Sequence, residues 1–107
     1  MMNPEESLQI GERIIQVIKT IFDPEIPVNI YDLGLIYEIH LDDDGTAHIR
    51  MTLTAPNCPE AERIPVEVHD KVNDVQGVTD TIVELVFDPP WNQDMMSENA
   101  LLELGFL

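Results

Sequence analysis

Two neighbouring segments in which apolar and polar residues alternate limit the fold of this chain more than any other feature of its sequence. They span residues 34–42 and 46–55. Apolar side chains at every second position are typical of a β-strand that buries one face. Because only a short acidic stretch separates the two segments, we predict a β-hairpin with a single apolar face.

The loop of this hairpin follows from the need to keep both apolar rows on the same face. A two-residue turn at Asp44-Gly45 would place the rows on opposite faces, because a register shift of one residue reverses every side chain. A three-residue loop, Asp43-Asp44-Gly45, with Gly45 in the left-handed conformation avoids this. The predicted register then pairs Leu41 with Ala47.

The N-terminal segment has the pattern of an amphipathic helix. Asn3 can cap its first turn, and Pro4 suits the first helical position. Apolar residues recur at helical spacing beyond this point, until the pair Asp23-Pro24 disfavours continuation, because the residue before a proline avoids the α conformation. We expect a helix over residues 4–22, followed by an extended loop rich in proline.

The second half of the chain adds a helix, a strand and a short helix. Apolar residues at helical spacing over residues 61–75 predict the second helix, and Pro65 is expected to cause a kink or a loose first turn. Residues 78–87 are predicted to form a third strand that is covered on both sides. A short helix with Asp94 or Ser97 as its cap follows.

Length and charge limit the class of protein. With 107 residues, one α/β domain, in the α+β two-layer form, is expected over residues 1–107. Five Lys and Arg against 21 Asp and Glu give a net charge of −16, which opposes binding to nucleic acid and to anionic membranes. Such charge keeps a small protein soluble or attracts a basic protein partner.

The cellular location is also predicted from the sequence. No apolar run approaches the roughly 20 residues that a membrane span requires. The N-terminus lacks the positively charged and apolar regions of a secretory signal. A single cysteine cannot form an internal disulfide. We therefore expect the protein in a reducing cytoplasm.

Cys58, the only cysteine, lies in the stretch TAPNCPEAE of residues 54–62. If Pro59 takes the first helical position, Cys58 caps the second helix, where the helix dipole favours the thiolate. Glu60 and Glu62 oppose this ionisation by their negative charge. A thiolate binds soft metals such as the iron of clusters, whereas the alternative is a buried cysteine that fills a corner of the core. The residues alone leave both interpretations open.

A single thiolate does not suffice to hold an iron–sulfur cluster, which normally has four protein ligands. The other ligands can come from a second subunit, from carboxylates such as Asp23 or Glu25, from a small thiol or from a partner protein. Transient holding or transfer fits this better than permanent storage. We favour a homodimer, because two chains supply two cysteines and can cover the apolar C-terminal tail.

Two histidines suggest a zinc site as a further alternative. The predicted register places His40 opposite His48 on the polar face of the hairpin, beside Glu38 and Arg50. Two imidazoles and a carboxylate are ligands that zinc accepts. We favour a solvated polar face instead, because Arg50 would repel a cation.

Three stretches of the chain resemble a known family when they are taken together. They are DPEIPVNIYDLGLIYEI at residues 23–39, TLTAPNCPEAE at residues 52–62 and VELVFDPPWNQDMMSENA at residues 83–100. In this order they look like the SufT and PaaD-type family of iron–sulfur cluster assembly factors. The resemblance implies a small mixed three-stranded sheet, similar to the C-terminal domain of NifU-type scaffolds. It also implies an accessory factor in cluster assembly or delivery to apoproteins, not an enzyme.

The resemblance assigns roles to individual residues. The family's single reactive cysteine corresponds to Cys58, and its acidic loop corresponds to Asp23 and Glu25. It implies that Cys58 contacts iron or sulfur transiently, with Asp23 and Glu25 as further metal ligands. The cofactor would be a transient iron–sulfur cluster or iron, and the partners would be a SUF-type scaffold or client apoproteins.

Two alternative functions are also considered. In the first, the protein is a non-catalytic adaptor that recruits client apoproteins through its acidic surface and apolar tail, and Cys58 is structural. In the second, it supports a phenylacetyl-CoA oxygenase, as PaaD-type proteins do. We disfavour the second, because longer PaaD-like chains carry an additional cysteine-rich C-terminal region that this sequence does not show.

Overall fold

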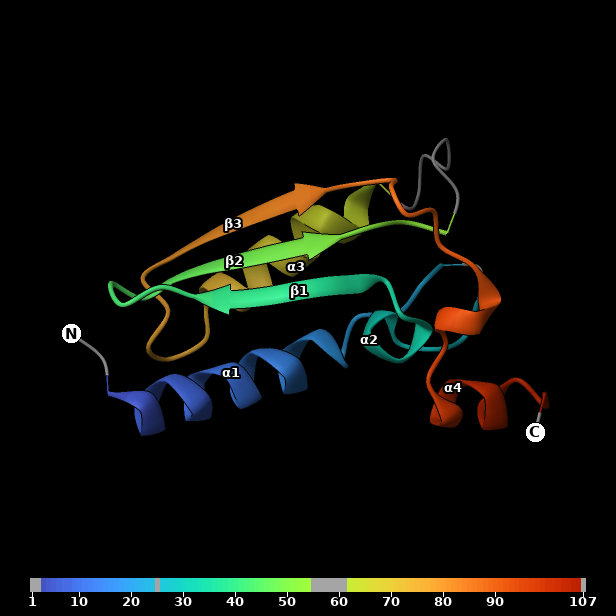
Figure 1. Ribbon diagram of the computed structural model, residues 1–107, viewed down its shortest axis with the longest axis horizontal. Helices are drawn as coiled ribbons and strands as arrows, with labels where there is room; N and C mark the ends of the chain where they lie inside the picture. Colours follow the sequence, from blue (N-terminus) through green and yellow to red (C-terminus); the bar gives the residue numbers. More distant parts are fainter. Residues whose placement is uncertain (1–2, 25, 55–61, 107) are drawn as a thin grey trace.

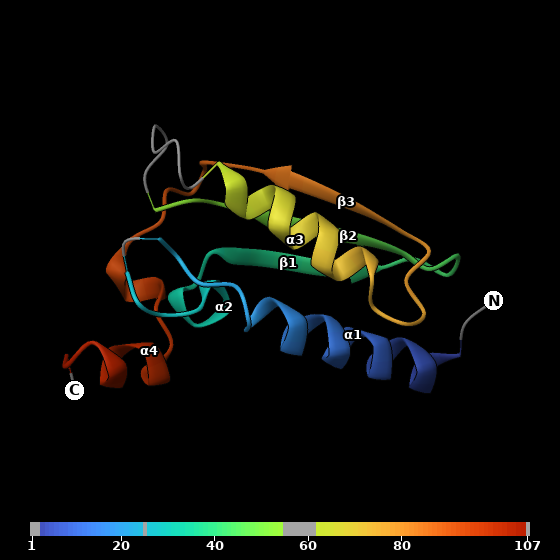
Figure 2. The same ribbon diagram turned by 180° about the vertical axis from the view of Figure 1, so that it is seen from behind.

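The computed structural model describes residues 3–24, 26–54 and 62–106. Within them, a three-stranded sheet in the order β1-β2-β3 carries the helices α1 and α3 on one face, while its other face is open (Figures 1 and 2). Apolar side chains from this covered face and from the two helices form the core. The mixed sheet with its helical layer confirms the predicted fold class.

Helix α1 (Pro4–Ile18) begins as the sequence predicts. The side chain of Asn3 accepts a hydrogen bond from the backbone N–H of Glu6 at 2.7 Å, and Pro4 occupies the first helical position. The buried stripe of the helix consists of Ile10, Ile14 and Ile18.

The end of α1 lies earlier than predicted. The helix stops at Ile18 instead of near residue 22, and the backbone N–H of Ile21 donates to the carbonyl of Ile18 in a tighter turn. Phe22 then pairs with Asn29 in an isolated antiparallel bridge. Ile21 is fully buried although it is not helical. Helical spacing of apolar residues therefore continues past the end of the helix, because a tight turn can bury its side chain on the same side.

A short helix that the sequence analysis missed, α2 (Ile30–Leu33), occupies part of the region predicted to be extended. The side chain of Asn29 caps it by accepting a hydrogen bond from the N–H of Asp32 at 2.9 Å. Gly34 ends it in the left-handed conformation, with φ of 86°. An Asn cap and a Gly stop were thus present in the sequence, but the two preceding prolines obscured them.

The hairpin forms as predicted. Strands β1 (Ile36–Leu41) and β2 (Thr46–Met51) are antiparallel, and Leu41 lies opposite Ala47. Gly45 has φ of 92° in the loop between them, which is the left-handed conformation that the predicted register requires. The local pattern of the sequence was therefore sufficient to predict the register.

Helix α3 (Arg63–Asn73) connects β2 to the parallel strand β3 (Asp80–Leu85). Glu62 is its N-terminal cap residue. The arrangement considered in the sequence analysis, with Pro59 in the first helical position and Cys58 as the cap, concerns residues that lie outside the described ones. The actual start places Pro65 third in the helix, where its missing N–H costs no hydrogen bond. A helix that began at Pro59 would hold this proline in its interior.

Strand β3 is shorter than predicted and is covered on only one side. Ile82 on the open face is 50% exposed, whereas Thr81, which faces the helices, is buried. The prediction of a strand covered on both sides is therefore wrong, because both long helices lie on the same face of the sheet.

The C-terminal segment forms a single turn, η1 (Gln93–Met95), and the short helix α4 (Glu98–Glu103). Of the two predicted caps, Ser97 is the one used, because its Oγ accepts a hydrogen bond from the N–H of Ala100 at 3.1 Å. Within the described ranges, no helix is long and apolar enough to cross a membrane.

Candidate functional site

The structure describes one of the three predicted site residues. Asp23 lies in the turn that follows α1, whereas Cys58 and Glu25 lie outside the described residues. The segment that carries Cys58 follows Thr54, which lies just beyond β2, and precedes α3. The turn after α1, the C-terminal end of β2 and α4 all lie at the same end of the molecule (Figures 1 and 2).

Asp23 connects two distant parts of the sequence at this end. Its side chain is buried, with 6% of the residue exposed. Oδ1 accepts a hydrogen bond from the backbone N–H of Ile26 at 3.0 Å, and Oδ2 accepts one from the hydroxyl of Thr54 at 3.4 Å. Thr54 precedes Cys58 by four residues. A carboxylate is therefore held at the base of the segment that carries the only cysteine.

Thr52 adds a second polar group near the same point of the chain. Thr52 is fully buried, and its backbone N–H donates to the carbonyl of Leu35 at 2.9 Å. The hydroxyl has no hydrogen-bond partner among the described residues. A buried hydroxyl without a partner costs about 1–3 kcal/mol. The last described residues before the Cys58 segment thus combine a carboxylate contact with a buried hydroxyl that has no partner in the described part of the chain.

Asp32 links α2 to α4 and was missed as a site of interaction by the sequence analysis. Its carboxylate accepts hydrogen bonds from Asn29 Nδ2 at 2.7 Å, Ser97 Oγ at 3.0 Å and Asn99 Nδ2 at 3.2 Å. Burial alone would raise the pKa of Asp32, but these three hydrogen bonds and the positive charge of Lys19 outweigh it and lower the pKa. The ionised carboxylate therefore holds the C-terminal segment in place.

The two histidines of the hairpin face each other, which confirms the predicted pairing of His40 with His48. Their Nε2 atoms lie 2.9 and 2.6 Å from the two carboxylate oxygens of Asp42. A carboxylate only accepts hydrogen bonds, so both Nε2 atoms carry a proton and donate. The hydrogen bond from His48 is the main cause that lowers the pKa of Asp42.

This arrangement does not favour the zinc alternative. Both Nε2 atoms are occupied by Asp42, and Glu38 lies 3.8 Å from the guanidinium of Arg50. In the part of the chain that the structure describes, no three His, Cys, Asp or Glu side chains are arranged to hold a metal ion. The geometry fits the solvated polar face that the sequence analysis favoured.

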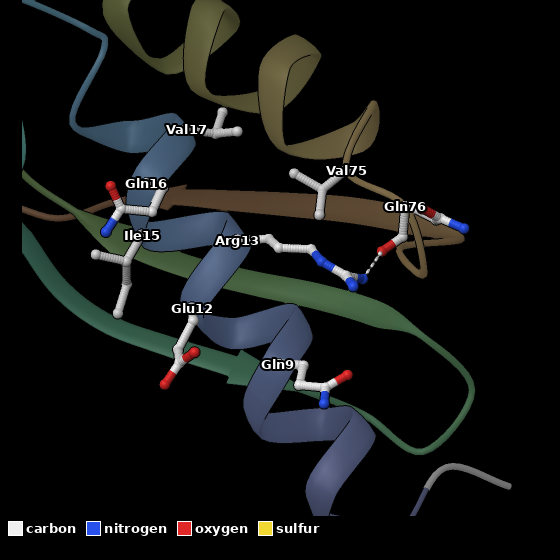
Figure 3. A pocket seen from close by; sticks show the side chains of 8 residues that line it. All are labelled: Gln9, Glu12, Arg13, Ile15, Gln16, Val17, Val75 and Gln76. Atoms are coloured by element: carbon white, nitrogen blue, oxygen red, sulfur yellow. Dashed lines mark hydrogen bonds between the residues drawn. The ribbon is translucent and has the colours of Figure 1, made fainter.

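A wide groove of about 850 Å³ lies between α1 and the segment that follows α3 (Figure 3). Arg13 reaches across it and donates from Nη1 to the backbone carbonyl of Gln76 at 3.4 Å. Among the described residues that line it, Glu12 is the only acidic one, and none of them is a predicted site residue. The described part of its lining therefore does not form a ligand set for iron.

Comparison with known proteins identifies relatives over most of the chain. The family described as iron-sulfur cluster assembly protein matches residues 11–85. A protein named Fe-S protein maturation auxiliary factor from Porphyromonas gingivalis is 55% identical over 102 residues, which cover 95% of this chain and 97% of the relative. A Staphylococcus aureus protein named Fe-S protein maturation auxiliary factor SufT is 39% identical and covers 79% of this chain and 97% of its own length.

A solved structure shares the fold. The crystal structure of a domain of unknown function, DUF59, from Bacillus anthracis superimposes with a TM-score of 0.87 and 31% sequence identity. The match covers 98% of this chain and all of that one, with 100% coverage. The arrangement of α1, the mixed sheet, α3 and the C-terminal segment is thus common to both proteins.

Proposed function

This chain belongs to the iron-sulfur cluster assembly protein family, and on that premise we propose that it is an auxiliary factor in the maturation of iron–sulfur proteins. The observation that carries the proposal is the 55% identity to a protein named as such a factor, over 95% of this chain. In this role the protein assists cluster assembly or delivery to apoproteins and is not itself an enzyme.

Cys58 is the residue proposed to contact iron or sulfur. It is the only thiol of the chain, and thiolates are the usual protein ligands of iron–sulfur clusters. Because one thiolate leaves most ligand positions of a cluster to other molecules, the contact is transient. A second subunit, a small thiol or the receiving apoprotein completes the ligand set. A thiol of this kind persists in a reducing compartment, which supports a cytoplasmic location.

Asp23 and Glu25 are proposed to supply oxygen ligands to the same iron. The hydrogen bonds of Asp23 support this placement, because they hold its carboxylate beside Thr54 at the start of the Cys58 segment. The hydroxyl of Thr54 donates to Asp23 Oδ2 at 3.4 Å, and a carboxylate that accepts this hydrogen bond keeps further lone pairs with which it can bind iron.

The proposed partners are a SUF-type scaffold and client apoproteins. The relative named SufT supports the assignment to a SUF-type system. A pure adaptor that recruits clients, with a structural Cys58, is the second candidate, and the net charge of −16 favours it because such a surface attracts basic proteins. Support of a phenylacetyl-CoA oxygenase ranks last, because the relatives described above are named for iron–sulfur protein maturation.

Anaerobic reconstitution tests the role of Cys58. The wild type and Cys58→Ala are incubated with iron and sulfide, and the visible spectrum and the iron and sulfide contents are measured. We expect a cluster band in the wild type that is absent in Cys58→Ala. If neither protein takes up iron, direct carriage is contradicted and the adaptor function is favoured.

A genetic experiment tests the function as a whole. In a strain that lacks the gene, a copy that encodes the wild type should restore the activities of iron–sulfur enzymes, and a copy that encodes Cys58→Ser should not. Full restoration by Cys58→Ser would show that the thiol is dispensable. No restoration by the wild type would contradict the maturation function itself.

A further inference from the structure

An apolar groove of about 410 Å³ lies between the turn after α1 and the C-terminal segment. Figure 2 shows these two segments next to each other, at the end of the molecule away from the N-terminus. Phe106 at its edge is 55% exposed. The apolar lining consists of Ile26, Pro27, Trp91, Met96, Leu104 and Phe106. We call this the α4 groove.

Two hydrogen bonds hold the C-terminal wall of the α4 groove in place. The indole Nε1 of Trp91 donates to the backbone carbonyl of Leu33 at 2.7 Å, which fixes the ring. The carboxylate of Asp32 binds the start of α4 through Ser97, at 3.0 Å from its Oγ. The C-terminal wall of the groove is therefore built into the fold, because two of its residues are hydrogen-bonded to α2.

The C-terminal segment that forms one wall of the α4 groove is acidic. Asp94 follows the groove residue Gln93, Glu103 precedes Leu104, and Glu98 starts α4; all three acids are exposed. From residue 72 to residue 106 the chain contains seven Asp and Glu and no Lys or Arg. Lys19, on the turn that ends α1, is engaged with the ring of Tyr31, at 5.3 Å from its centroid.

We propose that the α4 groove docks a segment of a partner protein in which an apolar anchor is flanked by lysine or arginine. The apolar lining provides a pocket for the anchor, and the acids around it attract the basic flanks. The proposal rests on the proposed function in one respect, namely that this partner is a scaffold or a client in iron–sulfur protein maturation.

The same charges argue against a second copy of this chain as the occupant. Each chain has a net charge of −16. An isologous contact through the α4 groove would bring Asp94, Glu98 and Glu103 of both copies together without any basic residue from this segment to balance them. Electrostatic complementarity is met by a basic partner and not by self-association.

The α4 groove is also continuous with the candidate site. Ile26 forms part of the groove wall, and its backbone N–H donates to Asp23 Oδ1 at 3.0 Å. A segment docked in the groove therefore lies next to the turn that holds the Asp23 carboxylate. This position suits a surface that brings a receiving protein to the site.

Trp91 makes the proposal directly measurable, because it is the only tryptophan of the chain and it lines the groove. The probe is a short synthetic peptide without tryptophan that carries Phe-Leu-Leu between two Lys-Lys pairs. Matched peptides carry Glu in place of Lys, or Ser in place of the apolar anchor. We expect a saturable change of Trp91 fluorescence with the first peptide and binding at least about tenfold weaker with the other two.

Variants locate the binding on the surface. Phe106→Ser and the double variant Glu98→Lys/Glu103→Lys should each weaken binding of the Lys peptide about tenfold. Leu8→Ser is the matched control for the apolar change, because Leu8 is 66% exposed and lies in the first half of α1, outside the groove. Glu5→Lys is the control for the charge change. Both control variants should bind as the wild type does.

Three results would overturn the proposal. They are a lack of saturable binding up to about 1 mM peptide, equal binding of the Lys and Glu peptides, and equal losses in the groove and control variants. A wild-type dimer that Phe106→Ser converts to a monomer in sedimentation would show that a second copy occupies the groove. Peptide binding should persist in Cys58→Ala, so loss of iron uptake and loss of docking are separate outcomes.

Discussion

The carboxylate of Asp32 accepts a hydrogen bond from the hydroxyl of Ser97 at 3.0 Å, although the two residues are 65 positions apart in the sequence. The backbone N–H of Ser97 also donates to the carbonyl of Asp32 at 2.8 Å. Ser97 in turn caps α4, whose last residues lead into the α4 groove. One residue of α2 therefore fixes the position of the C-terminal segment.

Asp32→Ala should lower the free energy of unfolding by about 2–3 kcal/mol. The substitution removes the buried carboxylate and with it three hydrogen bonds from side chains, which leaves the three donors without this acceptor. Urea unfolding measures this, and hydrogen exchange should show faster exchange of the α4 amides. Asp43→Ala in the exposed hairpin loop is the control and should change stability by less than about 0.5 kcal/mol. Equal effects of the two substitutions would contradict the role of Asp32.

The stabilisation by Asp32 should depend on pH. Its pKa in the folded protein is lowered from the ordinary value of 3.8, so its contribution is complete above that value and is lost as the pH falls through the folded pKa. The stability difference between the wild type and Asp32→Asn should therefore be constant from about pH 7 to about pH 5 and shrink below about pH 4. Urea unfolding at each pH measures it; a difference that stays constant to about pH 3 would contradict this linkage.

Gly34→Ala should destabilise the protein by about 2–4 kcal/mol. Gly34 has φ of 86°, and a methyl group there would meet the backbone carbonyl of Met95, with the carbonyl carbon at 2.8 Å. Gly11→Ala is the matched control, because Gly11 lies within α1 and, apart from its chain neighbours and the nearby backbone of its own helix, no described atom lies within 4 Å of the added carbon. It should stabilise the protein by about 0.5–1 kcal/mol. Thermal unfolding of both variants measures this: the unfolding temperature should fall for Gly34→Ala and rise for Gly11→Ala. A shift of both unfolding temperatures in the same direction would contradict the prediction.

Pro65→Ala should change the free energy of unfolding by less than about 1 kcal/mol. Pro65 is third in α3, where the backbone N–H has no partner within the helix. If α3 began at Pro59, the proline would lie in the helix interior, and its replacement would stabilise the protein by about 3 kcal/mol. Urea unfolding of Pro65→Ala and the wild type distinguishes a helix start at Arg63 from a start at Pro59.

Thr54→Val should lower the uptake of iron in anaerobic reconstitution, because it removes the hydroxyl that binds Asp23 Oδ2 at the base of the Cys58 segment. Thr54→Ser keeps the hydroxyl and should load iron as the wild type does. Circular dichroism spectra of both variants should match that of the wild type. Equal iron contents in Thr54→Val and the wild type would show that this contact does not position the carboxylate.

The sequence alone was sufficient for the features that depend on neighbours a few residues apart. The start of α1 depends on Asn3 and Pro4, and the hairpin register depends on Gly45 and the alternation on either side of it. The family and its fold also followed from the sequence, because three local stretches in a fixed order carried the resemblance.

Other features required the tertiary structure, because they depend on which distant segments pack together. Helical spacing did not reveal that α1 ends at Ile18, since Ile21 is buried by the turn that follows. Nor did the pattern of residues 78–87 reveal that one face of β3 is open, because the placement of both long helices on the other face decides it.

The surroundings of the candidate site were decided in the same way. The sequence selected Asp23 by resemblance, but only the folded chain brings it to Thr54, 31 residues away. The α4 groove joins Ile26 to Phe106, and the bonds of Asp32 to Ser97 and Asn99 hold it. No local rule relates such residues, because a contact across so many positions exists only once the core has set the path of the chain between them.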